Sequence, residues 1–450
     1  MNSKISRRKF MATSTATALG TGLAAHPFAI FADGAPARKI TVAIMGIRSR
    51  GNALATAFAS QPDCEIAYLC DVDSRYFENT LKAIEPLQKR KPKLEKDIRK
   101  VLEDKDVDAL VIAAPDHWHA PAAIMACQAG KHVYVEKPCS HNPKEGELLV
   151  QAARKYQRVV QMGNQRRSWP NVMAGIQDLQ AGVIGRVYYA RGWYTNTRES
   201  IGFGKTTAAP DYLDFDLWQG PAPRKPYQDN LHPYNWHWFW HWGTGESLNN
   251  GTHFLDLMRW GLGVNYPSRV VSTGGRYHFK DDWQTPDTQI ISLDFEEEKS
   301  ISWESRSCNS FPLNGTSAGV IFHGEGGTMI IPSGNEYAVY DNSRAAKLIK
   351  KVDESAKENN RPDAQNTVGP GEWFDGLHVL NFLQSIREGE RLHSEIEEGH
   401  KSVLLCQLGN IAYRTGRALN IDQRNGHIIG DPEAMNLWSR TYEPGWEINV

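Results

Sequence analysis

Short apolar runs alternate with longer helix-forming stretches through the first third of the chain. The runs are rich in Val, Ile and Ala and nearly free of charge, as strands buried on both faces are. Helical stretches between such runs indicate βαβ units, which place their strands in parallel. We predict strands at 40–45, 66–70, 107–114 and 132–135, and helices at 53–59, along an amphipathic segment ending near 103, at 120–129 and at 144–156. This pattern predicts a doubly wound parallel sheet.

A degenerate dinucleotide fingerprint follows the first predicted strand. Gly46-Ile-Arg-Ser-Arg-Gly51 places glycines at the first and last positions of G-x-G-x-x-G and Arg48 at the middle one. The first glycine permits a tight turn, the last lets the helix pack closely on the strand, and the middle one normally makes room for the pyrophosphate. Arg48 removes that room but brings a guanidinium that could reach a phosphate or cover an adenine.

An acid stands where such a site needs one. Asp71 follows Gly51 by about twenty residues, at the end of the second predicted strand, where a carboxylate binds the ribose 2′-hydroxyl. The acid favours NAD. NADP remains an alternative, because arginines lie near enough in sequence to hold a 2′-phosphate: Arg48, Arg50 and Arg75.

The amino terminus has the form of an export leader. Arg7-Arg-Lys-Phe10 precedes a weakly apolar stretch that ends near Ala25, so we predict a twin-arginine-type signal over residues 1–33 and a periplasmic protein. A basic tail is the alternative. No later run reaches the roughly 18 apolar residues of a membrane span.

Charge and cysteine content exclude other classes. Lys plus Arg total 51 against 52 for Asp plus Glu, which leaves no positive surplus for nucleic acid. The six cysteines include no C-x-x-C pair or zinc-like spacing, so we predict no disulfide framework. A single bridge between Cys64 and Cys70 stays open.

Two motifs resemble those of the Gfo/Idh/MocA family of oxidoreductases. They are Ala113-Ala-Pro-Asp-His-Trp-His119 and Glu136-Lys-Pro138, and the resemblance continues through 163–166, 243–256 and 397–401. It implies an NAD(P)-binding Rossmann domain over 38–160, then an α/β substrate and oligomerisation domain over 161–450 with a large open, mainly antiparallel sheet. It also implies an active site between them, a cis bond before Pro138, and a homo-oligomer, dimer or tetramer.

The pattern of the second half agrees with such a sheet. Six runs alternate or read as strands with little helix between them, as in an antiparallel sheet with one buried face: 184–194, 267–277, 288–295, 300–304, 318–323 and 328–331. Residues 375–388 and 397–415 read as helices, and the polar stretch 353–368 as a surface loop.

The resemblance also assigns catalytic positions. Lys137 matches the lysine that holds the reacting oxygen, and His253 matches the acid/base histidine, whose ordinary pKa suits proton transfer near neutral pH. Asn249 stands where the family commonly has Asp, and because an amide cannot take a proton, the base role shifts to His253. A helix over 247–258 would place Asn249 and His253 one turn apart on one face. A structural His253 in a degraded enzyme is the alternative.

Nine positions are predicted to bind the cofactor: Gly46, Arg48, Gly51, Asp71, Pro115, Asp116, His119, Glu136 and Asn164. Eight of the 14 Trp fall between residues 169 and 260, which indicates an aromatic wall for a small ring-shaped molecule. The predicted substrate-binding residues are Arg166, Trp236, His237 and Trp240. Two or three rings of the run 235–242 should belong to the core instead.

Three functions remain open on the sequence. The leading one is an NAD(P)-dependent oxidoreductase with a tightly held cofactor, acting on a secondary hydroxyl of a sugar, glycoside or polyol. The same lysine and histidine would serve redox-neutral glycoside cleavage, and Arg48 with Asn249 would suit a non-catalytic sugar-binding protein. A metal site at His232, His237, His241 and Asp256 is disfavoured, since no known ligand framework accompanies these residues.

Overall fold

The computed structural model describes residues 38–296, 298–353 and 371–450. The predicted leader over 1–33 and nearly all of the predicted loop over 353–368 lie outside the described residues. In the part of the chain that is described, no helix is both long and apolar enough to cross a membrane.

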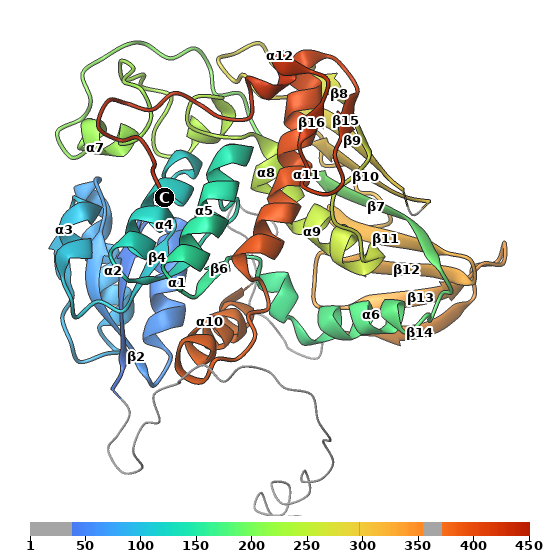
Figure 1. Ribbon diagram of the computed structural model, residues 1–450, viewed down its shortest axis with the longest axis horizontal. Helices are drawn as coiled ribbons and strands as arrows, with labels where there is room; N and C mark the ends of the chain where they lie inside the picture. The colour runs from blue at the N-terminus through green and yellow to red at the C-terminus, as the bar shows by residue number, and fades with distance from the viewer. Residues whose placement is uncertain (1–37, 297, 354–370) are drawn as a thin grey trace, which may run out of the picture. The chain divides into compact units, whose positions relative to one another are not determined.

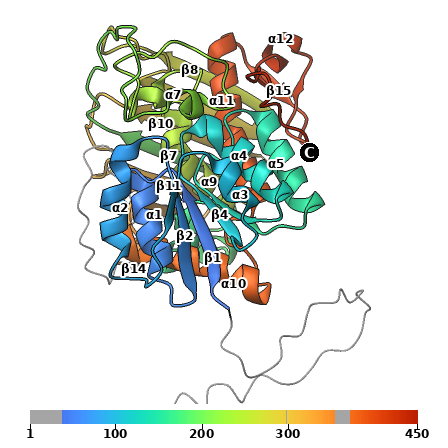
Figure 2. The same ribbon diagram turned by 90° about the vertical axis from the view of Figure 1, so that its left-hand side faces the viewer.

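The first part folds as a parallel sheet with helices on both faces. Its six strands run in the order β3-β2-β1-β4-β5-β6, with β1 (Ile40–Met45) at the centre beside β2 (Cys64–Cys70) and β4 (Ala109–Ile112). Helix α1 (Ser49–Ala59) lies on one face, and α4 (Asp116–Gln128) and α5 (Pro143–Lys155) lie on the other (Figure 2). The predicted doubly wound sheet is confirmed.

Two details of this domain differ from the prediction. The amphipathic segment up to residue 103 is not one helix but α2 (Phe77–Ile84), β3 (Lys93–Glu95) and α3 (Ile98–Glu103). Pro86 and Pro92 explain the break, because proline removes a helical donor and excludes helical backbone before it. In addition, β6 (Val160–Met162) pairs with β5 (His132–Val135), so the sheet extends past residue 160.

The second part contains a ten-stranded sheet in the order β14-β13-β12-β11-β7-β10-β9-β8-β15-β16. Strands β7 and β10 pair in parallel and every other pair is antiparallel, which confirms a mainly antiparallel sheet. Its strands are β7 (Val187–Thr195), β8 (Arg269–Gly275), β9 (Thr288–Phe295), β10 (Lys299–Arg306), β11 (Ala318–Gly324), β12 (Gly327–Pro332), β13 (Tyr337–Asp341), β14 (Leu348–Val352), β15 (Leu419–Ile421) and β16 (Ile428–Ile429).

Helices cover one face of this sheet. In Figure 1, α9 (Gly251–Leu262) and α11 (Ile396–Thr415) lie between the sheet and the Rossmann domain, and α6 (Pro170–Gln180) lies along the lower part of the sheet near β13. Buried and exposed residues alternate along β9, as expected when the opposite face meets solvent.

One late helix returns to the first domain. Helix α10 (Gly371–Glu388) packs Val379, Phe382 and Leu383 into the same core as Phe58 of α1 and Tyr134 of β5. The Rossmann domain is therefore completed by a helix more than 200 residues away in sequence.

The cysteines are unpaired throughout the described chain. Cys64 and Cys70 stand at opposite ends of the extended strand β2. Six residue steps of strand span roughly 20 Å, far beyond the reach of a disulfide, so the bridge left open by the sequence does not form.

Candidate active site

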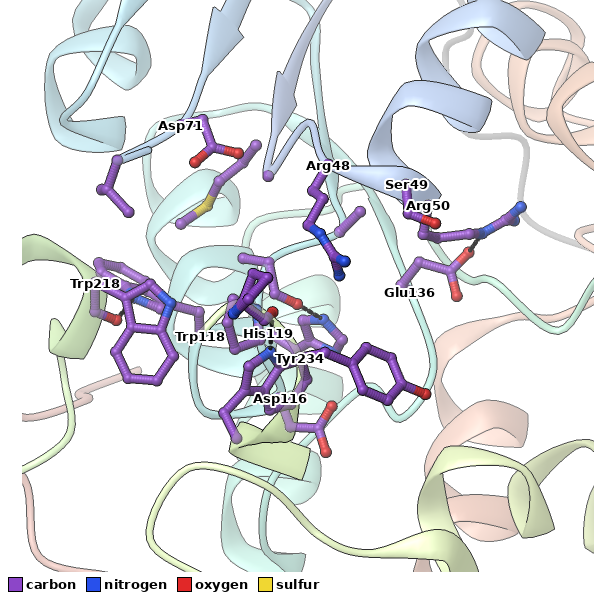
Figure 3. Close-up of a pocket in the computed structure, with 18 of the residues that line it drawn as sticks. Arg48, Ser49, Arg50, Asp71, Asp116, Trp118, His119, Glu136, Trp218 and Tyr234 are labelled. Atoms are coloured by element: carbon purple, nitrogen blue, oxygen red, sulfur yellow. Dashed lines mark hydrogen bonds and ion pairs between the residues drawn. The ribbon is translucent and has the colours of Figure 1, made fainter. Parts of the chain in front are cut away.

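A cavity runs along the carboxyl ends of the parallel strands and continues to the start of α9. Its lining includes the turn after β1, Asp71 after β2, Pro115 after β4, Lys137 after β5 and His253 of α9. Figure 3 shows part of this lining. The crevice beyond the carboxyl ends of such strands is where doubly wound sheets bind their ligands.

The turn between β1 and α1 requires both of its glycines. Gly46 has φ +78°, and a Cβ there would stand 2.7 Å from the carbonyl of Ala113. A Cβ on Gly51 would stand 1.7 Å from the carbonyl oxygen of Gly46. Gly51 does not line the cavity, and it serves the close packing of helix on strand that the fingerprint predicts.

Arg48 lines the cavity as the residue that precedes α1. Its side chain points into the cavity from the start of that helix (Figure 3). A cationic side chain beside the amino end of a helix suits a phosphate-bearing ligand.

Asp71 is held by two main-chain amides. Its carboxylate accepts hydrogen bonds from the Ile47 amide at 2.7 Å and the Asp73 amide at 2.9 Å. Burial nevertheless raises the pKa of Asp71 to about 6. The carboxylate is thus fixed in the cavity lining, where it would bind the ribose hydroxyls of a dinucleotide.

Two of the arginines that could bind the 2′-phosphate of NADP are paired with carboxylates of the protein. Arg50 binds Glu136 at 2.6 Å and forms a two-pronged pair with Asp375 at 2.6 and 2.8 Å. Arg75 binds Asp73 and stacks on the ring of Tyr212 at 3.6 Å. Their positive charges are already neutralised by carboxylates, which favours NAD. Figure 3 shows Arg50 turned toward Glu136.

The motifs after β4 and β5 are joined to each other. The two ring nitrogens of His119 lie 2.6 Å from the carbonyl oxygens of Ala114 and Pro138. Asp116 is buried, which raises its pKa, and accepts a hydrogen bond from the Thr244 hydroxyl. The Lys137–Pro138 bond is cis, as the resemblance implies.

Lys137 projects from β5 toward the segment that leads into α9. Its ammonium donates a 2.7 Å hydrogen bond to the main-chain carbonyl of Asn249 and lies 3.4 Å from that residue's side-chain oxygen. Burial lowers the pKa of Lys137, although Glu136 and Asp116 oppose this shift. A desolvated amine gives up its proton more readily than an exposed one.

His253 lines the cavity with Lys137 and Asn249. Burial, with the positive charges of Lys137 and Arg166, lowers its pKa well below the usual value, so the imidazole is neutral at pH 7 and can accept a proton. Its Nδ1 is buried and meets no hydrogen-bond partner in the described structure.

The helix predicted over 247–258 is wrong in one respect. The chain forms a short α8 (Glu246–Asn249), turns at Asn250, and begins α9 at Gly251. The side-chain amide of Asn250 binds the buried carboxylate of Glu246, which fixes the break. Asn249 and His253 therefore belong to two helices, yet both reach the cavity.

An aromatic wall lines the cavity opposite the Rossmann strands. His237 stacks on Trp236 with ring centres 3.6 Å apart and lies 2.6 Å from the Tyr234 carbonyl oxygen. Trp238 and Trp242 are each 2% exposed and belong to the core, as predicted for part of this run.

Several lining side chains are not among the predicted site residues: Trp118, Gln165, Trp218, His232 and Tyr234. Trp218 and His232 come from the segment before the aromatic run, which carries no recognisable spacing. Trp118 and Gln165 were predictable, since they lie inside the motifs 113–119 and 163–166. Gln165 donates to Glu136 at 3.0 Å.

Besides Gly51, three predicted site residues do not line the cavity. The Arg166 guanidinium lies over the rings of Trp169 and Phe254 and donates to the Ser333 carbonyl. Asn164 is buried directly after β6, and its side-chain atoms meet no partner in the described structure. Trp240 lies in a second cavity. The structure thus gives Arg166 and Trp240 no place beside Lys137.

The four residues of the metal alternative are engaged separately. His232 binds Asp73 at 2.9 Å, His241 lies 2.8 Å from the Pro223 carbonyl oxygen, and Asp256 pairs with Arg167. Within the described ranges, no group of three or more His, Cys, Asp or Glu could hold a metal ion.

The segment 212–232 of the second domain is hydrogen-bonded to residues 72–74, which follow Asp71. The Ser74 amide donates to the Tyr212 carbonyl and the Asp214 amide to the Val72 carbonyl, both at 2.9 Å. His232 adds its bond to Asp73. The part of the cavity beside Asp71 is therefore lined in part by residues from outside the Rossmann domain, such as Trp218 and His232.

The site fits a dinucleotide. It combines a turn whose two glycines leave no room for a side chain, a fixed carboxylate after β2 and a cavity that continues from there to Lys137 and His253. Gly46, Arg48 and Asp71 would hold the nucleotide end, and Lys137 with His253 would face the reactive ring.

Comparisons with known proteins agree with this geometry. Residues 40–164 match the model of an oxidoreductase family with an NAD-binding Rossmann fold, and residues 212–421 match the C-terminal alpha/beta domain of the same family. The chain has the fold of a levoglucosan dehydrogenase solved with NADH and levoglucosan, with a TM-score of 0.65, 19% identity, and coverage of 86% of this chain and 100% of that one.

Curated relatives match over shorter stretches. A glycosyl hydrolase family 109 protein of Saccharopolyspora erythraea is 29% identical over 204 residues, 42% of this chain and 44% of the relative. The levoglucosan dehydrogenase of Pseudarthrobacter phenanthrenivorans is 34% identical over 98 residues, 22% of this chain and 25% of the relative. The chain matches less than half the length of each. The two family models together span most of the chain, which belongs to the Gfo/Idh/MocA family of NAD-binding oxidoreductases.

Proposed function

We propose that this protein transfers hydride between a nicotinamide cofactor and a secondary hydroxyl of a sugar, glycoside or polyol. One observation carries the proposal: the Lys137 amine and the His253 imidazole line the same cavity as the nucleotide-binding turn and Asp71. Bound NAD would supply the hydride acceptor. The protein would supply the groups that hold the substrate oxygen and move its proton.

The two catalytic residues divide the work by their protonation states. Lys137 donates hydrogen bonds, so it would hold the substrate oxygen in place of the Asn249 carbonyl. His253 is neutral and would take the hydroxyl proton. Asn249 can orient a hydroxyl but cannot accept its proton.

The aromatic wall supports a carbohydrate. Trp236 and His237 present ring faces beside polar atoms, a combination that suits the alternating C–H and hydroxyl surfaces of a sugar. The dehydrogenase relative is named for levoglucosan, an anhydro sugar.

We propose further that the cofactor is tightly held. The segment 212–232 is hydrogen-bonded to the chain directly after Asp71, so the nucleotide would lie beneath it and could leave only after those bonds open. A retained cofactor would be restored to its starting state in place, by a second sugar or keto compound.

Redox-neutral glycoside cleavage is the second candidate, and the family 109 relatives favour it. Transient oxidation of a ring hydroxyl would acidify a neighbouring C–H, elimination would release the aglycone, and water addition with reduction would restore the sugar. The same lysine and histidine would act in both reactions.

Three measurements separate these functions. Denaturing the purified protein should release NAD, and screening sugars and polyols should identify one that reduces the bound nucleotide. Release of aglycone from a chromogenic glycoside, with no lasting change in nicotinamide absorbance, would favour cleavage. Protein that neither retains nor binds any nicotinamide nucleotide would be a sugar-binding protein instead.

Export is a separate proposal. The Arg7-Arg8 pair before Phe10 supports twin-arginine transport to the periplasm, which would carry the folded protein with its cofactor. Replacing both arginines by lysine should retain the precursor in the cytoplasm of a host that has this pathway. Unchanged periplasmic yield would contradict it.

We also propose a homo-oligomer formed through the open face of the second sheet. Alternate residues of β9 are exposed there, among them Ile290 at 47%. Light scattering should give a dimer or tetramer, and Ile290→Lys should shift it toward monomer. A monomeric wild type at micromolar concentration would refute this arrangement.

A further inference from the structure

A second cavity borders residues 243–248, the segment that leads into Asn249. Its walls come from the start of α5, from α11 and from residues 437–440 near the carboxyl terminus. Helices α5 and α11 lie side by side in Figure 1. The cavity contains Trp240, which the sequence assigned to the sugar site.

The lining of this cavity contains two arginines, one of which, Arg440, is paired with a carboxylate outside the lining. Its described residues include Arg414 and Arg440 but no Asp or Glu. Arg440 binds Glu145 at 2.7 Å and the His117 carbonyl at 2.7 Å, while its remaining nitrogen, Nη1, is buried without a partner in the described structure. Glu145 therefore neutralises the charge of Arg440, and the hydrogen-bond donors of Nη1 remain unused.

Arg414 has no carboxylate partner among the described residues. Its guanidinium lies 5.0 Å from the ring centre of Trp240. Arg414 is an exposed residue that lines the cavity, so its hydrogen-bond donors are available to a ligand.

Further polar groups around the same cavity lack partners in the described structure. They are both ring nitrogens of His141, the side-chain nitrogen of Asn142 and the side-chain oxygen of Gln407. Asn142 is 5% exposed and Gln407 is 3% exposed. Buried polar groups in native proteins are normally hydrogen-bonded, so this concentration points to a missing ligand.

Asn142 also places the amino end of a helix at the cavity. Its side-chain oxygen caps the 13-residue α5 by accepting from the Glu145 amide at 3.1 Å, which leaves the amide nitrogen unused. The partial positive charge at the start of α5 adds to the charge of Arg414, while the Glu145 carboxylate in the first turn of the helix offsets part of it.

We propose that this second cavity binds a small oxyanion, carried either by an acidic sugar as its carboxylate or by free inorganic phosphate. The two guanidiniums would bind the oxyanion, because their planar forks match carboxylate and phosphate oxygens. His141 and Gln407 would meet hydroxyl groups. The site is separate from the Lys137 cavity, and the proposal does not rest on the reaction assigned there.

Titration calorimetry with inorganic phosphate, glucuronate and glucose tests the proposal in low-salt buffer. At least one of the two anions should bind, and Arg414→Gln should weaken that binding at least tenfold. Binding of phosphate alone identifies a free phosphate site, and tighter binding of glucuronate identifies an acidic sugar. Arg424→Gln is the matched control, because Arg424 is an exposed arginine paired with its neighbour Asp422.

A second variant separates loss of the site from loss of the fold. Asn142→Asp keeps a good helix cap but places a negative charge in the cavity, so it too should abolish anion binding. Both variants should keep the circular dichroism spectrum and melting temperature of the wild type without ligand. The proposal is overturned if neither anion binds the wild type, or if either variant binds the anions as tightly.

Discussion

The Lys137 ammonium donates a 2.7 Å hydrogen bond to the main-chain carbonyl of Asn249, and so joins the end of β5 to the end of α8. The bond spans the boundary between the parallel and the mainly antiparallel halves of the molecule. It brings a desolvated amine to the entrance of α9, where His253 lies.

Removal of the Lys137 amine should slow the hydride-transfer reaction without releasing the bound nucleotide. We predict that Lys137→Ala lowers kcat by about 10²- to 10⁴-fold, the range for loss of a positioned proton-transfer group. The nucleotide content of the purified protein should stay the same. Lys155→Ala, at the end of α5, is the control. Equal loss of activity and nucleotide would assign Lys137 to cofactor binding instead.

Asp71 should decide the choice of cofactor. Asp71→Ala removes the carboxylate that would bind the ribose hydroxyls and would repel a 2′-phosphate, so NAD affinity should fall about tenfold or more while NADP affinity changes less or rises. Binding of both nucleotides to stripped protein, measured by fluorescence, gives the ratio. A parallel fall for both would show that Asp71 does not touch the ribose.

The ion pair between Arg50 and Asp375 should stabilise the attachment of α10. Asp375 is 3% exposed, and its loss would leave the Arg50 guanidinium without its two-pronged partner. Asp375→Leu should lower the free energy of unfolding by about 2–4 kcal/mol, measured by urea denaturation. Arg50→Met combined with Asp375→Leu should recover part of the loss, and additive losses would show that the pair is not coupled.

Acid should destabilise the protein below about pH 6.5. Burial lowers the pKa of His378 to about 3 and of His400 to about 4, so the unfolded chain takes up protons that the folded protein does not. Their contribution is present above the unfolded pKa and is lost as pH falls toward the folded values, at up to about 1.4 kcal/mol per pH unit for each. Asp71, whose pKa is raised, opposes this with one proton between about pH 6 and 4.

Urea denaturation at pH 7.5, 6.5 and 5.5 measures this slope. Stability should fall across the series, and His400→Gln should flatten the fall because it removes one of the buried, neutral imidazoles. A stability that stays constant or rises toward pH 5.5 would contradict the assignment of neutral buried histidines.

The sequence predicts the local part of this architecture and misses the distant part. Strands such as 288–295 can be predicted because apolar and polar residues alternate where burial alternates. The turn at Gly46 can be predicted because a side chain at Gly46 or Gly51 would clash with the main chain, which fixes the spacing of the two glycines. The return of α10 to the Rossmann core leaves no local pattern, since Val379 and Phe382 would be apolar in any buried helix.

The same limit explains the errors at the site. Arg166 follows a family motif, but whether it faces substrate or the rings of Trp169 and Phe254 depends on tertiary packing. Trp240 belongs to a run of aromatic residues whose short 3₁₀ turn ends at Trp238, after which the chain carries it to the other cavity. Composition predicts an aromatic wall but does not say which rings form it.

Transfer of deuterium from a sugar to the bound nucleotide tests the central claim most directly. Protein incubated with a substrate deuterated at the oxidised carbon is denatured, and the released nucleotide is examined by mass spectrometry. We predict NAD-derived nucleotide that carries the label in the wild type and no label in the variant with both Lys137→Ala and His253→Ala. Absence of bound nucleotide, or undiminished labelling in that variant, would contradict the account.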